Sequence, residues 1–162
     1  MSILILGGAG FVGRHYTEYF LKTGKNVEIV DNLAPLSGGV HPRKWKLFNP
    51  SKFKKKFKFS NLDCRKFFKK KLIKNYELVI NLAAIVGGRE VIEYNPLAVA
   101  EDLEIDTAFW RWVVKNKSKI RHIITYSSSA AYPINLQKKG GYRLLKESDI
   151  DFSKNYMGKP DL

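Results

Sequence analysis

Short apolar runs alternate with segments of helical periodicity along the chain. The first run, residues 3–6, leads into a glycine-rich stretch at residues 7–13. Apolar residues then recur at helical spacing, at Tyr16, Tyr19, Phe20 and Leu21. Residues 23–25 stop this helix, and a second apolar run at residues 26–30 ends on Asp31. The pattern predicts a strand, a glycine turn, a helix and a second strand parallel to the first.

The same alternation continues through most of the chain. Three more strands are expected, at residues 57–62, 77–82 and 122–126. A short basic helix is expected at residues 65–75, and a longer one from about residue 90 to residue 116 with an interruption at residues 95–96. Residues 33–53 have no steady period and predict a long surface connection. Five strands separated by helices predict an α/β fold, a doubly wound Rossmann-type parallel sheet with strand order 3-2-1-4-5.

Length and composition limit the class of protein. A chain of 162 residues accommodates one domain, and 44% hydrophobic with 27% charged residues is typical of a folded globular protein. A single cysteine, Cys64, excludes an internal disulfide framework, and no metal site is expected. The apolar run at residues 3–6 is too short for a signal peptide, and no window reaches membrane-spanning length. We therefore expect a soluble, cytoplasmic protein.

The charge balance is strongly basic. The chain has 29 Lys and Arg against 15 Asp and Glu, a formal net charge of +14. The densest basic runs lie at residues 52–58 and 69–71, and neither matches a known nucleic-acid module. A solvated face is the favoured interpretation, an anionic partner is the alternative, and nucleic acid is not expected.

The glycine-rich stretch satisfies two overlapping motifs. Gly7, Gly10 and Gly13 form GxxGxxG, whereas Gly8, Gly10 and Gly13 form GxGxxG. Glycine lets the backbone turn tightly and approach a phosphate, and the helix that follows directs its N-terminus at the anion. The motif therefore predicts a binding site for the pyrophosphate of a dinucleotide.

Carboxylates end the second and third predicted strands. Asp31 follows Gly13 by 18 residues, where its carboxylate can accept hydrogen bonds from the adenosine ribose and repel a 2′-phosphate. This placement favours NAD over NADP as the cofactor. Asp63 has two interpretations that the sequence leaves open, a contact to the adenine end or the N-cap of a helix that begins at Cys64.

Four motifs in order carry a resemblance to a known family. They are residues 7–13 (GGAGFVG), 31–33 (DNL), 81–84 (NLAA) and 127–133 (SSSAAYP). With these motifs the chain resembles extended short-chain dehydrogenases of the nucleotide-sugar epimerase/dehydratase family. The resemblance runs from residue 3 to about residue 162 and covers only the N-terminal half of a typical member. Members use bound NAD to oxidise a sugar hydroxyl transiently and return the hydride after a rearrangement.

The resemblance implies a role for each matching residue. The pyrophosphate would be held by Gly7, Gly10 and the amides of Phe11 and Val12, the ribose by Asp31 and Asn32, and the adenine end by Asp63 and Cys64. Leu82, Ala83 and Ala84 would line the cofactor, Ser127 would lie near the nicotinamide half, and Ser129 would be the catalytic hydroxyl that hydrogen-bonds the reacting sugar oxygen. Val86, Gly87 and Gly88 resemble the nucleotide-sugar contact in the form found in GDP-sugar epimerases, and a UDP-sugar or a dTDP-sugar remains open as the alternative.

The family's catalytic Tyr-Lys pair, YxxxK, is not identified in this chain. Tyr156 is followed by Lys159, a spacing of three in place of four. Tyr142 and Lys146 have the required spacing, but Tyr142 follows Ser129 by only 13 residues. The tail at residues 158–162 resembles the segment that precedes the catalytic tyrosine. We therefore expect residues 1–162 to form an incomplete NAD-binding domain without the C-terminal substrate domain, inactive alone.

Two functions remain open from the sequence. The first is the NAD-binding part of a nucleotide-sugar epimerase or dehydratase, with a nucleotide sugar as substrate and a homodimer in the full-length form. The alternative is a non-catalytic NAD-binding or sensing module. One further departure concerns the helix after Pro96, where relatives carry an asparagine and the nearest polar candidate here is Asp102.

Overall fold

The computed structural model describes residues 2–70, 72–85, 94–127, 132, 136 and 144–150. The chain divides into two units, residues 1–125 and 126–162. The first unit contains the sheet and its helices, and the described part of the second contains a short 3-10 helix, η7 (Glu147–Asp149). No helix among the described residues is long and apolar enough to cross a membrane.

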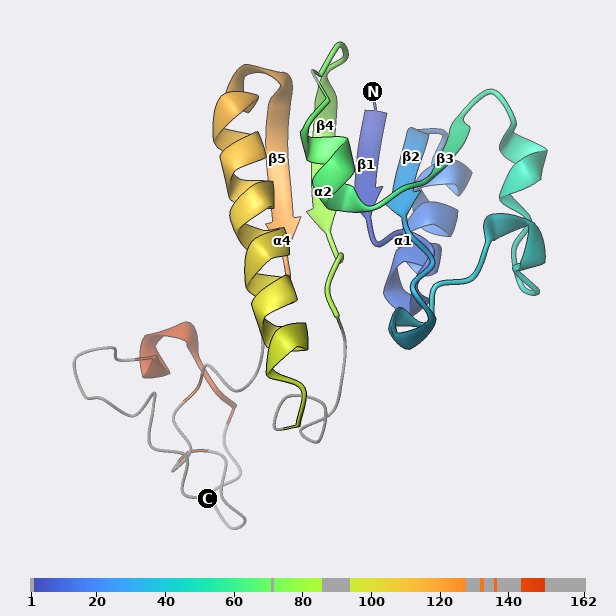
Figure 1. The fold of residues 1–162 in the computed structure, drawn as a ribbon. Coiled ribbons are helices and arrows are strands. Elements are labelled where there is room, and N and C mark those ends of the chain that lie inside the picture. The colour runs from blue at the N-terminus through green and yellow to red at the C-terminus, as the bar shows by residue number, and fades with distance from the viewer. Residues whose placement is uncertain are drawn as a thin grey trace. The chain divides into compact units, whose positions relative to one another are not determined.

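The first unit is built on a five-stranded parallel sheet (Figure 1). Its strands are β1 (Ser2–Leu6), β2 (Asn26–Asp31), β3 (Phe57–Asn61), β4 (Tyr76–Asn81) and β5 (Ile120–Thr125). They lie in the order β3-β2-β1-β4-β5, and Ile5 of β1 pairs with Ile29 of β2 and Ile80 of β4. The fold class and the strand order predicted from the sequence are confirmed. The order reverses beside β1, where ligands bind to sheets of this kind.

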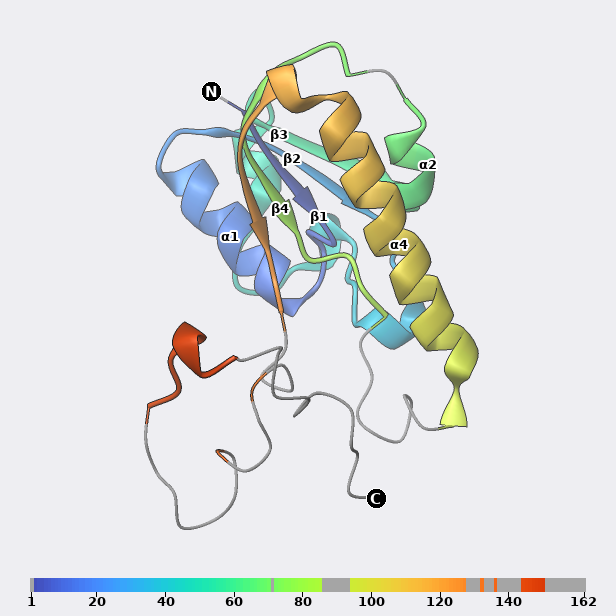
Figure 2. The same cartoon turned by 90° about the vertical axis from the view of Figure 1, so that its left-hand side faces the viewer.

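Helices cover both faces of the sheet (Figure 2). On one face lies α1 (Phe11–Lys22), and on the other lie α2 (Cys64–Phe68) and α4 (Pro96–Lys115). A 3-10 turn, η4 (Lys117–Lys119), connects α4 to β5. The prediction of a helix over residues 65–75 was wrong in its extent, because α2 ends at Phe68. Continuing it would place Lys66 and Lys70 as like charges at i,i+4.

Successive side chains of β1 point to opposite faces, and each face has its own core. Ile3 and Ile5 pack in the core beneath α1, and Leu4 and Leu6 pack in the core beneath α2 and α4. The aromatic side chains of α4 are buried to different extents. Phe109 and Trp112 are buried in the second core, whereas Trp110 is half exposed.

The connection between β2 and β3 is folded. It contains three 3-10 helices, η1 (Pro35–Ser37), η2 (Pro42–Lys44) and η3 (Pro50–Phe53). Trp45 is buried in the core beneath α1 and donates its indole N–H to the Val40 carbonyl at 2.7 Å. The Val40 N–H in turn donates to the carbonyl of Ala9 at 3.1 Å. The expected surface connection is thus anchored by an aromatic side chain and supports the glycine loop.

Candidate functional site

Close packing requires glycine at two positions of the loop between β1 and α1. Gly7 has φ of +73°, and a Cβ there would lie 2.7 Å from the carbonyl carbon and oxygen of Leu82. At Gly13, in the first turn of α1, a Cβ would lie 2.6 Å from the Cα of Gly8. Both contacts are with backbone, which cannot give way. The loop is therefore packed directly against the chain that follows β4 and against its own helix.

Gly10 differs from these two glycines because the fold leaves room for a side chain there. A Cβ at Gly10 would meet only the Gly7 carbonyl oxygen, at 3.4 Å, an ordinary contact. Gly10 is the N-cap of α1, and among the described residues no side chain caps this helix. The first turn carries no acidic residue either. The amides of Phe11 and Val12 thus lie at the positive end of the helix dipole, where they can bind an anion.

Asp31 links the end of β2 to the glycine loop. Its Oδ2 accepts a hydrogen bond from the Ala9 N–H at 2.9 Å, and its Oδ1 accepts one from the Leu33 N–H at 2.8 Å. The residue is 7% exposed, so the carboxylate is fixed in place beside the loop. Each oxygen keeps a second lone pair for a further donor. Leu33 has φ of 56°, so this bond is made within a tight left-handed turn.

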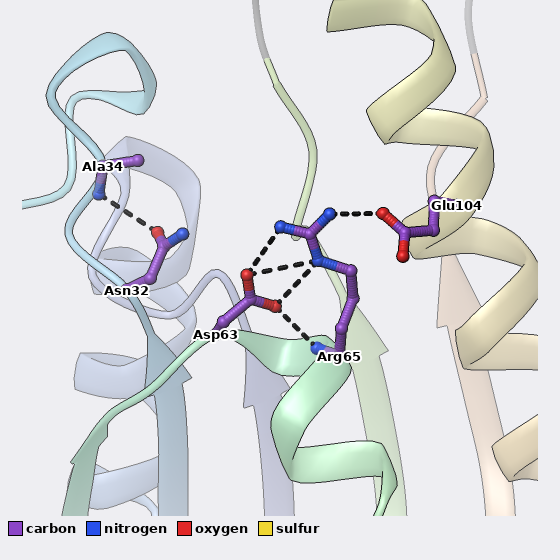
Figure 3. A network of polar contacts seen from close by, with 5 residues as sticks. All are labelled: Asn32, Ala34, Asp63, Arg65 and Glu104. Carbon is purple, nitrogen blue, oxygen red and sulfur yellow. Dashed lines mark hydrogen bonds and ion pairs between the residues drawn. The ribbon is translucent and has the colours of Figure 1, made fainter.

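Asn32 follows Asp31 and is exposed. Its Oδ1 accepts a hydrogen bond from the Ala34 N–H at 3.0 Å (Figure 3). This bond leaves the side-chain NH₂ group of Asn32 as the donor that a ligand could use.

Asp63 caps α2 and pairs with an arginine. Its Oδ1 accepts from the Arg65 N–H at 2.8 Å, which confirms the N-cap interpretation. The Arg65 guanidinium binds both carboxylate oxygens and also reaches Glu104 of α4 (Figure 3). Hydrogen bonds from Arg65 hold the pKa of Asp63 below its usual value, although partial burial opposes them. Sequence reasoning missed Arg65 and Glu104, two residues 39 positions apart in the sequence whose pairing joins α2 to α4.

The side chain of Cys64 points into the core beneath α2 and α4. Burial raises the pKa of its thiol to about 11, so the thiol is protonated at neutral pH and unreactive. Any contact of Cys64 with a ligand would therefore come from its main chain.

The segment after β4 runs past the glycine loop. The Leu82 N–H donates to the Leu6 carbonyl at 2.9 Å, and the Ala83 N–H donates to Oδ1 of Asn81 at 3.3 Å. Leu82 and Ala83 are partly buried and Ala84 is exposed. Asp102 of α4 accepts a hydrogen bond from the Ile85 N–H at 2.6 Å. Asp102, the nearest polar residue to the position where relatives carry an asparagine, thus binds the main chain of the segment after β4.

Several predicted site residues lie outside the described part of the chain. These are Val86, Gly87, Gly88 and Ser129. Ser127 is described, is exposed and belongs to the second unit. Within the described residues, no group of His, Cys, Asp or Glu is arranged to hold a metal ion. The structure thus brings together the glycine loop, Asp31 and the segment after β4.

Comparisons with known proteins agree with this geometry. Over 96 residues the chain is 41% identical to a UDP-glucuronate 4-epimerase from Thermodesulfobacterium geofontis (strain OPF15), an overlap of 57% of this chain and 29% of that protein. A UDP-galactose 4-epimerase structure matches with a TM-score of 0.62 and 25% identity, over 82% of this chain and 40% of that one. The fold is also that of a UDP-glucose 4-epimerase from Bifidobacterium longum in complex with NAD⁺ and UDP (TM-score 0.62, 24% identity, 82% of this chain and 38% of that one).

The chain therefore spans less than half the length of these relatives. The model of one family, the NAD-dependent epimerase/dehydratase family, matches residues 3–152. That match covers most of the sequence and includes the glycine loop, Asp31 and the segment after β4. The chain belongs to the NAD-dependent epimerase/dehydratase family.

Proposed function

We propose that this chain is the NAD-binding part of a nucleotide-sugar epimerase or dehydratase. The observation that carries the proposal is the open side of the glycine loop at Gly10, beside the uncapped N-terminus of α1 and the fixed carboxylate of Asp31. Protein packing accounts for Gly7 and Gly13 but not for Gly10. The close approach of a phosphate would account for the glycine at position 10. Bound NAD would supply a reversible acceptor for the hydride of a sugar hydroxyl.

Different residues around the loop would bind different parts of the dinucleotide. The amides of Phe11 and Val12 would donate hydrogen bonds to the pyrophosphate, and the dipole of α1 would favour its negative charge. Asp31, held by Ala9 and Leu33, would accept from the ribose hydroxyls through its remaining lone pairs. A fixed negative charge at this point repels a 2′-phosphate, so we expect NAD to be preferred over NADP.

The residues proposed for the chemistry rest on the family resemblance. Ser129 would hydrogen-bond the reacting sugar oxygen, with Ser127 near the nicotinamide half and residues 86–88 against the nucleotide sugar. The relatives named above are described as acting on UDP-sugars. Residues 86–88 of this chain resemble the form found in GDP-sugar epimerases. Titrating the NAD-loaded protein with UDP-glucose and with GDP-mannose distinguishes the two nucleotide classes.

Calorimetric titration with NAD and NADP tests the proposal, after circular dichroism has shown that each variant is folded. We expect NAD to bind more tightly than NADP. Asp31→Asn should weaken NAD binding by about 10- to 100-fold, as expected for the loss of hydrogen bonds to a charged group. Asp106→Asn removes a carboxylate from α4 outside the loop and is the matched control, with no change expected. A folded protein that binds neither dinucleotide would contradict the proposal.

A further inference from the structure

A concave site lies at the edge of the sheet opposite the glycine loop, where β1, β2 and β3 begin (upper edge in Figure 1). The cavity has a volume of about 320 Å³. Its lining includes Lys55, Lys56, Lys58 and Lys74, together with the carboxylate of Glu28. The glycine loop and Asp31 lie at the carboxyl edge, so the residues proposed to bind NAD take no part in this cavity.

Glu28 fixes two of the four lysines in the cavity. The glutamate is 3% exposed, its Oε1 accepts from Nζ of Lys58 at 2.8 Å, and its Oε2 accepts from Nζ of Lys74. The hydroxyl of Tyr76 also donates to Oε2, at 2.8 Å. Both carboxylate oxygens are thus engaged from within the protein. Each ammonium group still has two N–H donors that Glu28 does not use.

Lys55 and Lys56 add charge that the protein does not neutralise. Both are exposed, and within the described part of the chain neither forms an ion pair. Four lysines against one glutamate leave this cavity with a formal charge of +3. Like charges gathered in one cavity repel one another, and a multiply charged anion would relieve the repulsion.

The kind of basic residue indicates the kind of anion. Among the described residues the cavity is lined by lysines and by no arginine, so no planar fork is offered for bidentate binding of an anion. Lysine ammonium groups act as point charges and suit a tetrahedral phosphate. A volume of about 320 Å³ exceeds what one phosphate requires. We propose that this cavity, which we call the lysine pocket, binds a small anion that carries two or more linked phosphate groups.

Calorimetric titration with tripolyphosphate tests the lysine pocket. Lys55→Gln/Lys56→Gln should weaken binding by about five- to tenfold, the size expected for losing two partly exposed ion pairs. The matched control is Lys69→Gln/Lys70→Gln, which removes the same charge beyond α2 and should leave the affinity unchanged. Saturating NAD should also leave the affinity unchanged, because the two sites lie at opposite edges of the sheet.

Four outcomes would overturn the proposal. Equal weakening by the two double variants would mean that tripolyphosphate responds only to net charge. Displacement by NAD would place the anion at the glycine loop. Citrate that binds as tightly as tripolyphosphate would remove the preference for phosphate. A single-stranded oligonucleotide that binds more tightly than tripolyphosphate, and is released by Lys55→Gln/Lys56→Gln, would assign the lysines to a nucleic-acid surface.

Discussion

The two edges of the sheet present positive charge by different physical means. At the carboxyl edge the positive end of α1 is formed by backbone amides, and the glycine loop leaves room beside them at Gly10. At the amino edge, where β1, β2 and β3 begin, the charge belongs to lysine side chains arranged around the buried carboxylate of Glu28. Backbone amides are held rigidly by the helix, whereas exposed ammonium groups are mobile and strongly screened by salt. The first edge suits geometric recognition of one ligand, and the second suits recognition by charge.

The largest effect that we expect from a single substitution concerns the glycine loop at the carboxyl edge. Gly7→Ala should lower the free energy of unfolding by about 3 kcal/mol, because it adds a left-handed strain and a backbone clash with Leu82. Gly10→Ala should cost less than about 1 kcal/mol, since its Cβ has room and only the N-cap preference is lost. Urea unfolding measures both values.

The same pair of variants separates folding from binding. Gly10→Ala should remain folded and bind NAD about tenfold more weakly or worse, because the new methyl group occupies the approach of the phosphate. If Gly10→Ala binds NAD as tightly as the unsubstituted protein, the ligand does not approach the loop at Gly10.

The next largest effect on stability concerns Glu28 at the amino edge. Glu28→Ala should lower the free energy of unfolding by about 2 kcal/mol, because it leaves the buried hydroxyl of Tyr76 without its acceptor. Lys58 and Lys74 are exposed enough to be hydrated. Losing their ion pairs with Glu28 therefore adds little to the cost in stability. Glu77→Ala is the matched control, since its pair with Lys25 is partly exposed and should contribute about 0.5 kcal/mol or less. Equal costs for the two variants would show that Glu28 does not organise the amino edge.

Residue spacing explains why only one edge could be predicted from the sequence. A glycine loop needs specific residues at fixed positions within seven residues, so the motif was visible, and parallel strands joined by helices determined the strand order. The amino edge combines residues 28, 58, 74 and 76, which come from different elements and follow no local pattern. Glu28 stands within an apolar strand, and a buried carboxylate there is a signal that could have been noted. Arg65 and Glu104 likewise meet only through the packing of α2 against α4.

Acid pH gives a smaller and more specific test of Glu28. Burial alone would raise its pKa, but hydrogen bonds from Lys58, Lys74 and Tyr76 together hold the pKa below the ordinary value of 4.5. A carboxyl group whose pKa is lower in the folded than in the unfolded state stabilises the fold above pH 4.5, and this contribution is lost as pH falls. Glu28→Gln cannot titrate.

The difference in unfolding free energy between the unsubstituted protein and Glu28→Gln should therefore shrink as the pH falls below 4.5. Urea unfolding at several pH values measures it. A difference that stays constant from neutral pH into the acid range would show that the lysines do not stabilise the charged form of Glu28.

The smallest effect concerns the contacts of Arg65 with Asp63 and Glu104 at the carboxyl edge. Arg65→Gln should cost less than about 1 kcal/mol, because Glu104 is largely exposed and the N-cap bond from Asp63 to the Arg65 main chain survives the substitution. The pKa of Asp63 should rise toward its ordinary value of 3.8, since the Arg65 guanidinium is the main cause of its lowering. Carboxyl chemical shifts followed by NMR measure this pKa. Glu104→Gln leaves the contact between Arg65 and Asp63 in place, so it should barely change the Asp63 pKa. A similar rise of the Asp63 pKa in both variants would mean that this pKa depends on the ion pair between α2 and α4, and not on the direct contact of Asp63 with Arg65.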